Sequence, residues 1–115
     1  MPVFDLVILG VGADGHTASL FPGSLTLTET MLLAIPVMLP LPGLNRVTLS
    51  LPVLNHARQV VFMASGRRKA AIVGELLGRG ACSEQYPASL VRPAAGKLQW
   101  QLDIEAASEL QERPS

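Results

Sequence analysis

Apolar residues occur along this chain in short runs separated by glycine, proline and polar residues. Two of these runs, Val3 to Leu9 and Gln59 to Ala64, are rich in β-branched residues and have the length of strands. Apolar runs with little polar interruption are typical of strands that are buried on both faces of a parallel sheet. We therefore expect these two segments to be central strands.

The other strand candidates have different patterns. Met31 to Val37 is a further apolar run, followed by an expected loop from Leu39 to Asn45. In Lys97 to Leu102 apolar and polar residues alternate, which predicts a half-exposed strand. Val47 to Ala57 begins like a strand, but Pro52 suits the first turn of a helix, so both interpretations stay open for it.

Helices are predicted between the strands. Arg68 to Leu77 carries an apolar stripe at helical spacing, and short helices are expected at Thr17 to Phe21 and at Ile104 to Leu110. Pro87 to Val91 is expected to be a turn or a short helix. Strands that alternate with helices predict an α/β fold, a mainly parallel sheet flanked by helices, in a single domain over residues 1–115.

Composition excludes several classes of function. The chain has 115 residues, with nine basic and nine acidic residues, so no basic surface for nucleic acid is expected. Cys82 is the only cysteine, which excludes an internal disulfide and fits a reducing compartment. The two histidines lie far apart in the sequence and predict no metal site. We expect a cytoplasmic protein without membrane contact, and the 49% apolar content suggests that it packs against a partner or itself.

A glycine-rich loop follows the first predicted strand. Gly10, Gly12 and Gly15 have the spacing of a dinucleotide-binding turn, but Asp14 lies inside that turn, and we reject a nicotinamide site. No Gly-Lys-Ser/Thr follows, so this is not a P-loop either. In open parallel sheets, ligands bind outside the carboxyl ends of the strands, where this loop lies.

Asp14 and His16 are the residues of this loop with chemical potential. A histidine can take a proton from water, and a nearby carboxylate can fix its tautomer and raise its basicity. The alternative is a loop histidine that only hydrogen-bonds the backbone. From the residues alone the two interpretations are balanced.

The stretch GVGADGHTASLFPGS (10–24) resembles the signature of the 6-phosphogluconolactonase family, in the wider glucosamine-6-phosphate isomerase superfamily. The similarity continues in RVTLSLPVLNHARQVVFMASGRRKAAIV (46–73) and PASLVRPAAGKLQWQLD (87–103). It spans nearly the whole chain but corresponds only to the carboxyl-terminal half of the family's domain. The resemblance therefore implies a Rossmann-like fold of which this chain supplies one part of the sheet.

The resemblance implies hydrolysis of 6-phosphogluconolactone to 6-phosphogluconate, a step of the pentose phosphate pathway. It implies that His16 is the general base that activates water and that Asp14 supports it. It also implies that Lys69 and Arg46 hold the substrate's phosphate, although both could be ordinary surface residues. No metal or organic cofactor is expected, and the partner is a phosphorylated sugar lactone.

Three further residues of the loop are predicted to contact substrate. The backbone N–H groups of Gly12 and Gly15 could stabilise an oxyanion, and Thr17 is expected to cap a helix or line the pocket. By contrast, His56 is expected to be a partly buried structural histidine. Trp100 and Tyr86 are expected to pack inside the fold rather than to bind a ligand.

Two alternative functions stay open at this point. One is the deaminase/isomerase branch of the same superfamily, which has a similar Asp-Gly-His triplet followed by an Asn-Glu pair. This chain has Leu20 and Phe21 at those positions, so the carboxylate is missing. The other is a truncated domain without catalytic activity, whose incomplete sheet leaves an apolar edge that favours self-association.

Overall fold

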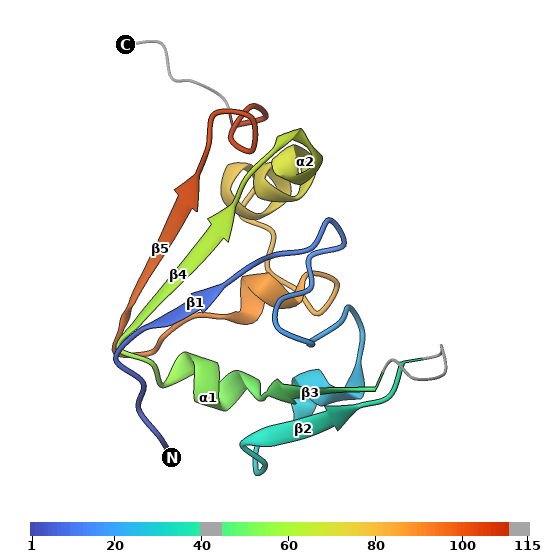
Figure 1. The fold of residues 1–115 in the computed structure, drawn as a ribbon, viewed down its shortest axis with the longest axis vertical. Helices are drawn as coiled ribbons and strands as arrows, with labels where there is room; N and C mark the ends of the chain where they lie inside the picture. Colours follow the sequence, from blue (N-terminus) through green and yellow to red (C-terminus); the bar gives the residue numbers. More distant parts are fainter. Residues whose placement is uncertain (40–44, 111–115) are drawn as a thin grey trace.

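A three-stranded parallel sheet forms the centre of the molecule, in a computed structural model that describes residues 1–39 and 45–110. Its strands are β1 (Val7–Leu9), β4 (Gln59–Ala64) and β5 (Lys97–Leu102), in the order β1-β4-β5 (Figure 1). Val7 lies opposite Val60, and Gln59 lies opposite Lys97. The predicted α/β class and the mainly parallel sheet are confirmed.

A separate hairpin-like pair lies below this sheet in Figure 1. Its strands, β2 (Ala34–Val37) and β3 (Arg46–Leu49), pair antiparallel. The strand predicted from Met31 is thus confirmed in its second half. The loop predicted at Leu39 to Asn45 lies mostly outside the described residues.

The stretch Val47 to Ala57, for which the sequence allowed either a strand or a helix, contains both in succession. β3 ends at Leu49, and α1 (Leu51–Asn55) begins two residues later with Pro52 in its first turn. Proline is tolerated there because the first turn of a helix has no partner for its N–H group. The strand-like start and the helical end of Val47 to Ala57 are therefore both confirmed.

The predicted helix after β4 is present as one continuous helical stretch. It runs through η2 (Arg67–Lys69), α2 (Ala70–Val73) and η3 (Gly74–Gly78), the last with π-type hydrogen bonds. A single turn, η4 (Pro87–Leu90), confirms the short helix expected there, and η1 (Leu25–Thr28) is an additional turn that was not predicted. None of the helices in the described part of the chain is long and apolar enough to cross a membrane.

Two predicted helices are wrong. Thr17 to Phe21 forms a tight turn in which Ala18 has a positive φ of 51°, a left-handed conformation that a helix does not contain. Ile104 to Leu110 forms successive turns rather than a helix. There the Asp103 carboxylate accepts a hydrogen bond from the Ala106 N–H at 2.8 Å and another from the Gly66 N–H at 3.1 Å, tying the ends of β5 and β4 together.

The core lies on one face of the sheet only. Phe62 in β4 is fully buried and stacks on Trp100 of β5 with ring centroids 4.4 Å apart. Burying such a side chain contributes about 1.5–3 kcal/mol relative to leaving it in water. Residues from α1, α2, η3 and η4 join the same core, which shows that the helices cover this face.

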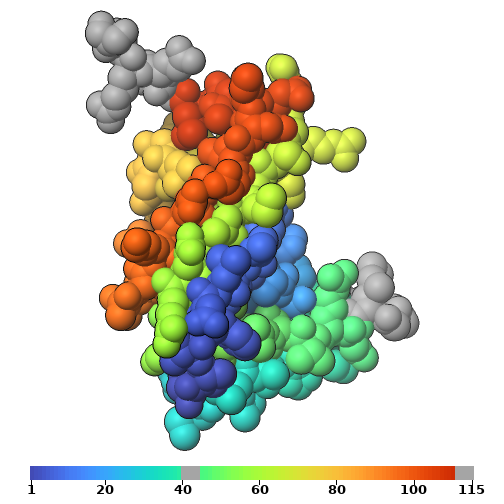
Figure 2. Space-filling model, turned by 60° about the vertical axis from the view of Figure 1, so that its left-hand side comes forward, coloured from blue at the N-terminus to red at the C-terminus, as the bar shows by residue number. Residues whose placement is uncertain are grey.

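The other face of the sheet is uncovered in the described part of the chain. Figure 2 shows β1, β4 and β5 side by side at the surface. Ile8 of β1 is 60% exposed and Met63 of β4 is 54% exposed. The prediction that Val3 to Leu9 and Gln59 to Ala64 are buried on both faces is therefore wrong in the described part of the chain, where no element packs against their outer side chains.

Candidate functional site

The glycine loop leaves the carboxyl end of β1 and closes on itself through backbone hydrogen bonds. The Gly12 N–H donates to the His16 carbonyl at 2.9 Å, and the Gly15 N–H donates to the Gly12 carbonyl at 2.9 Å. Gly15 has a φ of +88°, which an L side chain rarely adopts. These contacts bring Asp14 and His16 together at the top of the loop.

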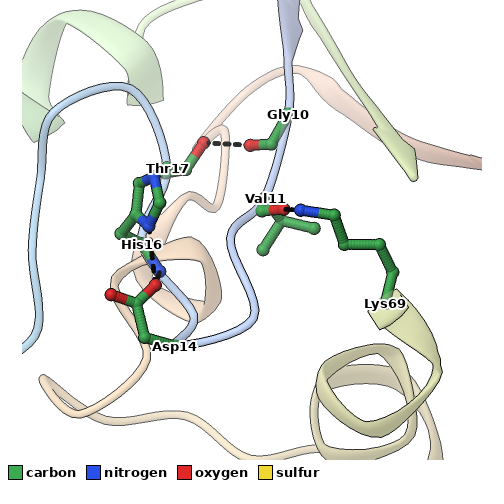
Figure 3. A network of polar contacts seen from close by, with 6 residues as sticks. All are labelled: Gly10, Val11, Asp14, His16, Thr17 and Lys69. Carbon is green, nitrogen blue, oxygen red and sulfur yellow. Dashed lines mark hydrogen bonds and ion pairs between the residues drawn. The ribbon is translucent and has the colours of Figure 1, made fainter. Parts of the chain in front are cut away.

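Asp14 and His16 form a direct pair (Figure 3). The His16 Nδ1 lies 2.6 Å from the Asp14 Oδ1, and the same carboxylate oxygen accepts the His16 backbone N–H at 3.0 Å. The side chain of His16 is 34% exposed and that of Asp14 is 53% exposed. With Nδ1 engaged, Nε2 has no hydrogen-bond partner among the described residues and is the ring nitrogen left to act on a ligand.

The pairing depends on the absence of a side chain at Gly12. A Cβ at this position would lie 2.2 Å from both Cε1 and Nδ1 of His16 and 2.8 Å from the Asp14 Oδ1. Contacts this short do not occur between real atoms, so any larger residue would displace the ring. Gly12 therefore provides the space in which the histidine ring lies against its carboxylate.

The charge of Asp14 is stabilised by the pair. Partial burial raises the pKa of its carboxyl, but the hydrogen bonds from the His16 backbone and ring, together with the charge of His16, lower it. The lowering effects prevail, and the pKa of Asp14 lies below its ordinary value of 3.8. Near neutral pH the carboxylate of Asp14 is thus ionised. Because an ionised carboxylate only accepts hydrogen bonds, the Nδ1 of His16 carries the proton and donates it.

Lys69 reaches the same loop from the helical stretch after β4. Its Nζ donates to the carbonyl of Val11, and Figure 3 shows the side chain extending from the helix to the loop. An ammonium group has three N–H donors, so this bond leaves two for a ligand. Arg67 and Arg68 beside it are exposed, as expected.

Thr17 supports the loop from inside the fold. Its side chain is buried, with 1% exposed, and its hydroxyl donates to the Gly10 carbonyl at 2.7 Å. The expectation of helix capping is wrong, because no helix begins there. Its predicted contact with substrate stays a prediction.

Phe21 is a contact residue that the sequence reasoning missed. Its ring stacks on the ring of His16 with centroids 4.9 Å apart and an interplanar angle of 30°. The residues 17–20 form a turn in which Thr17 and Leu20 pair as an isolated bridge, and this turn returns the chain to His16. The Pro22-Gly23 pair directly after Phe21 was a signal for such a turn.

Arg46 lies at the start of β3 and is exposed. Alternate residues of a strand share a face, so it shares one with Thr48, whose hydroxyl accepts the Ser19 N–H at 3.1 Å. Arg46 is thus on the side of β3 that contacts the 17–20 turn. The described contacts do not join Arg46 to Asp14, His16 or Lys69, and its role as a phosphate ligand stays a prediction.

The N–H groups of Gly12 and Gly15 are not available to an oxyanion in this conformation, and their contact with substrate stays a prediction. Both N–H groups are used by the hydrogen bonds that close the loop. The Ala13 N–H, which has no partner among the described residues, is the remaining candidate donor in this part of the loop.

The remaining candidates have structural contacts. Tyr86 packs against Gly15 and Trp100 against Phe62, which confirms both as packing residues. The His56 Nδ1 bonds the Pro52 carbonyl at 2.8 Å, but this histidine is exposed rather than partly buried.

Two grooves lie elsewhere on the molecule. One, of about 380 Å³, is lined mainly by residues of η3, η4 and β5, and the other, of about 270 Å³, lies over the ends of β4 and β5. Neither of these two grooves is lined by Asp14, His16 or Lys69. Residues 1–39 and 45–110 contain no cluster of three or more potential metal ligands, and the prediction of a metal-free site stays a prediction.

Comparison with known proteins gives one consistent family. The family model described as "Glucosamine-6-phosphate isomerases/6-phosphogluconolactonase" matches residues 1–100. A 6-phosphogluconolactonase from Bos taurus is 52% identical over 108 residues, which cover 93% of this chain and 42% of the relative. The chain therefore spans about two fifths of the length of this relative.

Solved structures give the same result. The devB protein superposes with a TM-score of 0.84 at 37% identity, covering 96% of this chain and 46% of that one. The 6-phosphogluconolactonase of Trypanosoma brucei superposes with a TM-score of 0.78, also at 37% identity, covering 96% of this chain and 44% of that one. These partial matches agree with the expectation that the chain corresponds to one part of a larger domain.

Proposed function

The chain belongs to the glucosamine-6-phosphate isomerase/6-phosphogluconolactonase family, and on that premise we propose that it takes part in the hydrolysis of 6-phosphogluconolactone to 6-phosphogluconate. The observation that carries the proposal is the Asp14–His16 pair at the carboxyl end of β1, with Nδ1 held by the carboxylate and Nε2 available. The named relative with 52% identity is a lactonase, which supports the same reaction.

The reaction follows from the geometry of the pair. The Nε2 of His16 takes a proton from water, and the resulting hydroxide oxygen bonds to the lactone carbonyl carbon. The negative charge of the tetrahedral intermediate is stabilised by loop donors such as the Ala13 N–H. When the carbon–oxygen bond of the ring breaks, the departing oxygen takes the proton back from Nε2 and becomes a hydroxyl group. Asp14 stabilises the imidazolium during the interval.

The phosphate of the substrate is assigned to Lys69, with Arg46 as a second contact. Two N–H donors of the Lys69 ammonium remain after its bond to Val11. No organic cofactor or metal is required for water attack on an activated ester. A cytoplasmic location and the absence of nucleic-acid or membrane partners stay predictions.

The deaminase alternative has less support. Leu20 is fully buried and Phe21 stacks on His16, so neither position supplies the carboxylate that this chemistry requires. A non-catalytic domain is the other alternative, and the assay below distinguishes the three.

His16→Ala is the deciding variant. We expect the chain to hydrolyse 6-phosphogluconolactone above the spontaneous rate, weakly because it spans only part of its relatives' length, and His16→Ala to lower that excess about 10²–10⁴-fold. His56→Ala is the matched control, since it removes the other histidine and should leave the rate unchanged. A His16→Ala variant with half the original rate would reject His16 as the base. Release of ammonia from glucosamine 6-phosphate would favour the deaminase. Absence of turnover of both compounds would favour the non-catalytic domain.

A further inference from the structure

Two contacts restrict the ring of His16, and only one of them involves Asp14. The hydrogen bond at Nδ1 acts at one edge of the imidazole, 2.6 Å from the Asp14 carboxylate, and can be kept over a range of small ring rotations. The Phe21 ring lies against the face of the imidazole, with centroids 4.9 Å apart and planes 30° apart. This separation is within the range in which aromatic rings attract each other. Stacking therefore adds a contact on the face of the ring that opposes these rotations.

The backbone between the two rings holds them in this arrangement. Ala18 adopts a positive φ of 51°, and the Leu20 N–H donates to the Thr17 carbonyl at 2.9 Å. The Ser19 N–H donates to the buried hydroxyl of Thr48 on β3 at 3.1 Å, which joins the turn to the hairpin. A helix at 17–21 would not have returned Phe21 to the face of His16. The unexpected turn thus has a consequence for the site.

We propose that Phe21 is a positioning residue for His16: its ring and the Asp14 carboxylate together hold the imidazole with Nδ1 protonated and Nε2 left to act on a ligand. Phe21 contacts the base rather than the substrate. This inference rests on the proposed function for the reaction that His16 performs, but the orientation of the ring can be measured without substrate.

The first test is a nitrogen-15 NMR spectrum of the histidine side chains in the 115-residue chain. Only His16 and His56 contribute signals, and His56 serves as an internal reference because it bonds Pro52 elsewhere. We expect ring-to-ring nuclear Overhauser effects between Phe21 and His16 and a single Nδ1-protonated tautomer of the neutral His16 ring. Absence of these Overhauser effects in the unmodified chain would overturn the proposal, without the need for any variant.

Variants then separate positioning from packing. Phe21→Leu should give a mixture of His16 tautomers with the His56 signals unchanged, and Phe21→Tyr should restore the single tautomer. Phe4→Leu makes the same substitution at the opposite end of β1 and should change nothing. A single Nδ1-protonated tautomer in Phe21→Leu, with intact His56 signals, would show that Asp14 is sufficient and reject the role of Phe21. If Phe21→Leu fails to fold, the Overhauser effects in the unmodified chain and in Phe21→Tyr decide.

Kinetics give an independent readout. With 6-phosphogluconolactone, Phe21→Leu should lower kcat about 10-fold to 100-fold, because small displacements of a catalytic group have effects of this size, and should leave KM nearly unchanged. Phe21→Tyr should recover most of kcat. A rise in KM as large as the fall in kcat would indicate a lost contact with substrate instead and would contradict the proposal. If the unmodified chain turns over no lactone while the tautomer results hold, the proposed function fails and the positioning role does not.

Discussion

Gly12 shows how much of the site depends on a missing side chain. The imidazole of His16 occupies the space that a Cβ at Gly12 would need, with two ring atoms 2.2 Å from that point. The hydrogen bond between His16 and Asp14 therefore requires glycine at position 12, although Gly12 has no side chain that could take part in the reaction. At this scale the candidate base and the glycine beside it are one unit.

We expect Gly12→Ala to abolish most of the lactonase activity with the fold retained. The new methyl group forces the His16 ring away from the Asp14 carboxylate, and a misplaced general base loses about 10²-fold in rate. The measurement is kcat together with the far-ultraviolet circular dichroism spectrum. Gly10→Ala is the control, because a Cβ at Gly10 meets no atom within 4 Å. Equal activities of the two variants would show that the ring position does not depend on Gly12.

The charge of Asp14 predicts a pH dependence of stability. Its pKa is lowered in the folded chain, so the ionised form is favoured by folding. The contribution of Asp14 to the free energy of unfolding should be fully present above about pH 4. It should be lost as the pH falls through the folded-state pKa, below 3.8. Urea unfolding between pH 2 and pH 7 should show a smaller acid-dependent loss of stability for Asp14→Asn than for the unmodified chain. Glu29, whose pKa is also lowered by the Met31 and Leu32 N–H groups, contributes equally in both.

The control for this experiment is Asp5→Asn, which removes a carboxylate that pairs with Arg58 on an exposed surface at 3.1 Å. Asp5→Asn should lose as much stability in acid as the unmodified chain does, and more than Asp14→Asn does. If Asp14→Asn and the unmodified chain lost stability in parallel, the lowered pKa would be rejected.

At the scale of single residues, sequence reasoning found the chemistry but not its supports. Asp14 and His16 could be predicted because their types and spacing have chemical meaning. Phe21 and the buried hydroxyl of Thr17 could not, because both roles depend on a turn with a positive φ at Ala18, and alanine gives no local signal for that conformation.

The helical stretch Arg67–Gly78 is connected to the glycine loop through one side chain. Lys69 donates from the first turn of this stretch to the Val11 carbonyl, so it joins the segment after β4 to the segment after β1. The two carboxyl ends are neighbours because β1 and β4 pair in parallel. A ligand between them would contact both elements.

Lys69→Ala should raise KM for 6-phosphogluconolactone more than it lowers kcat. Removing a contact to the non-reacting phosphate weakens substrate and transition state alike, and such a loss appears in KM. Steady-state kinetics over a range of substrate concentrations measure both constants. Arg68→Ala is the neighbouring control, since this residue is exposed, and should change neither constant. An unchanged KM in Lys69→Ala would reject Lys69 as a phosphate ligand and would leave it only the structural hydrogen bond to Val11.

Elements with a strong apolar pattern could be predicted, and those governed by tertiary contacts could not. Gln59 to Ala64 and Lys97 to Leu102 match β4 and β5 at both ends. Ile104 to Leu110 has helix-forming composition, but it is too short to be helical without packing, and the Asp103 carboxylate bonds the backbone in turns instead.

For the whole molecule, the uncovered face of the sheet predicts association. Ile8 and Met63 present large apolar side chains on that face, and β1 and β5 each have one unpaired edge among the described strands. Exposed apolar faces and free strand edges are sites of protein association. We propose that the isolated 115-residue chain associates through this face, and light scattering should report a mass above 12.2 kDa.

Substitutions on the outer face test this directly. Ile8→Gln and Met63→Gln should lower the mass measured by light scattering, because they replace apolar surface with polar groups. Leu25→Gln is the control, since this leucine is 87% exposed but lies in η1, away from the sheet. A monomer with a sharp unfolding transition would contradict the prediction, and so would an equal effect of Leu25→Gln.

The parallel pairing of β1 with β4 also has a consequence for the order of folding. Val7 and its partner Val60 are 53 positions apart in the sequence, and Gln59 and Lys97 are 38 apart. Each pairing must close a long loop, at a cost in chain entropy, before any contact compensates for it. Since both neighbours pair with β4, no part of this sheet can form before β4 has been synthesised. The stretch that contains Asp14 and His16 is made early but reaches its place beside Lys69 only when that later strand arrives.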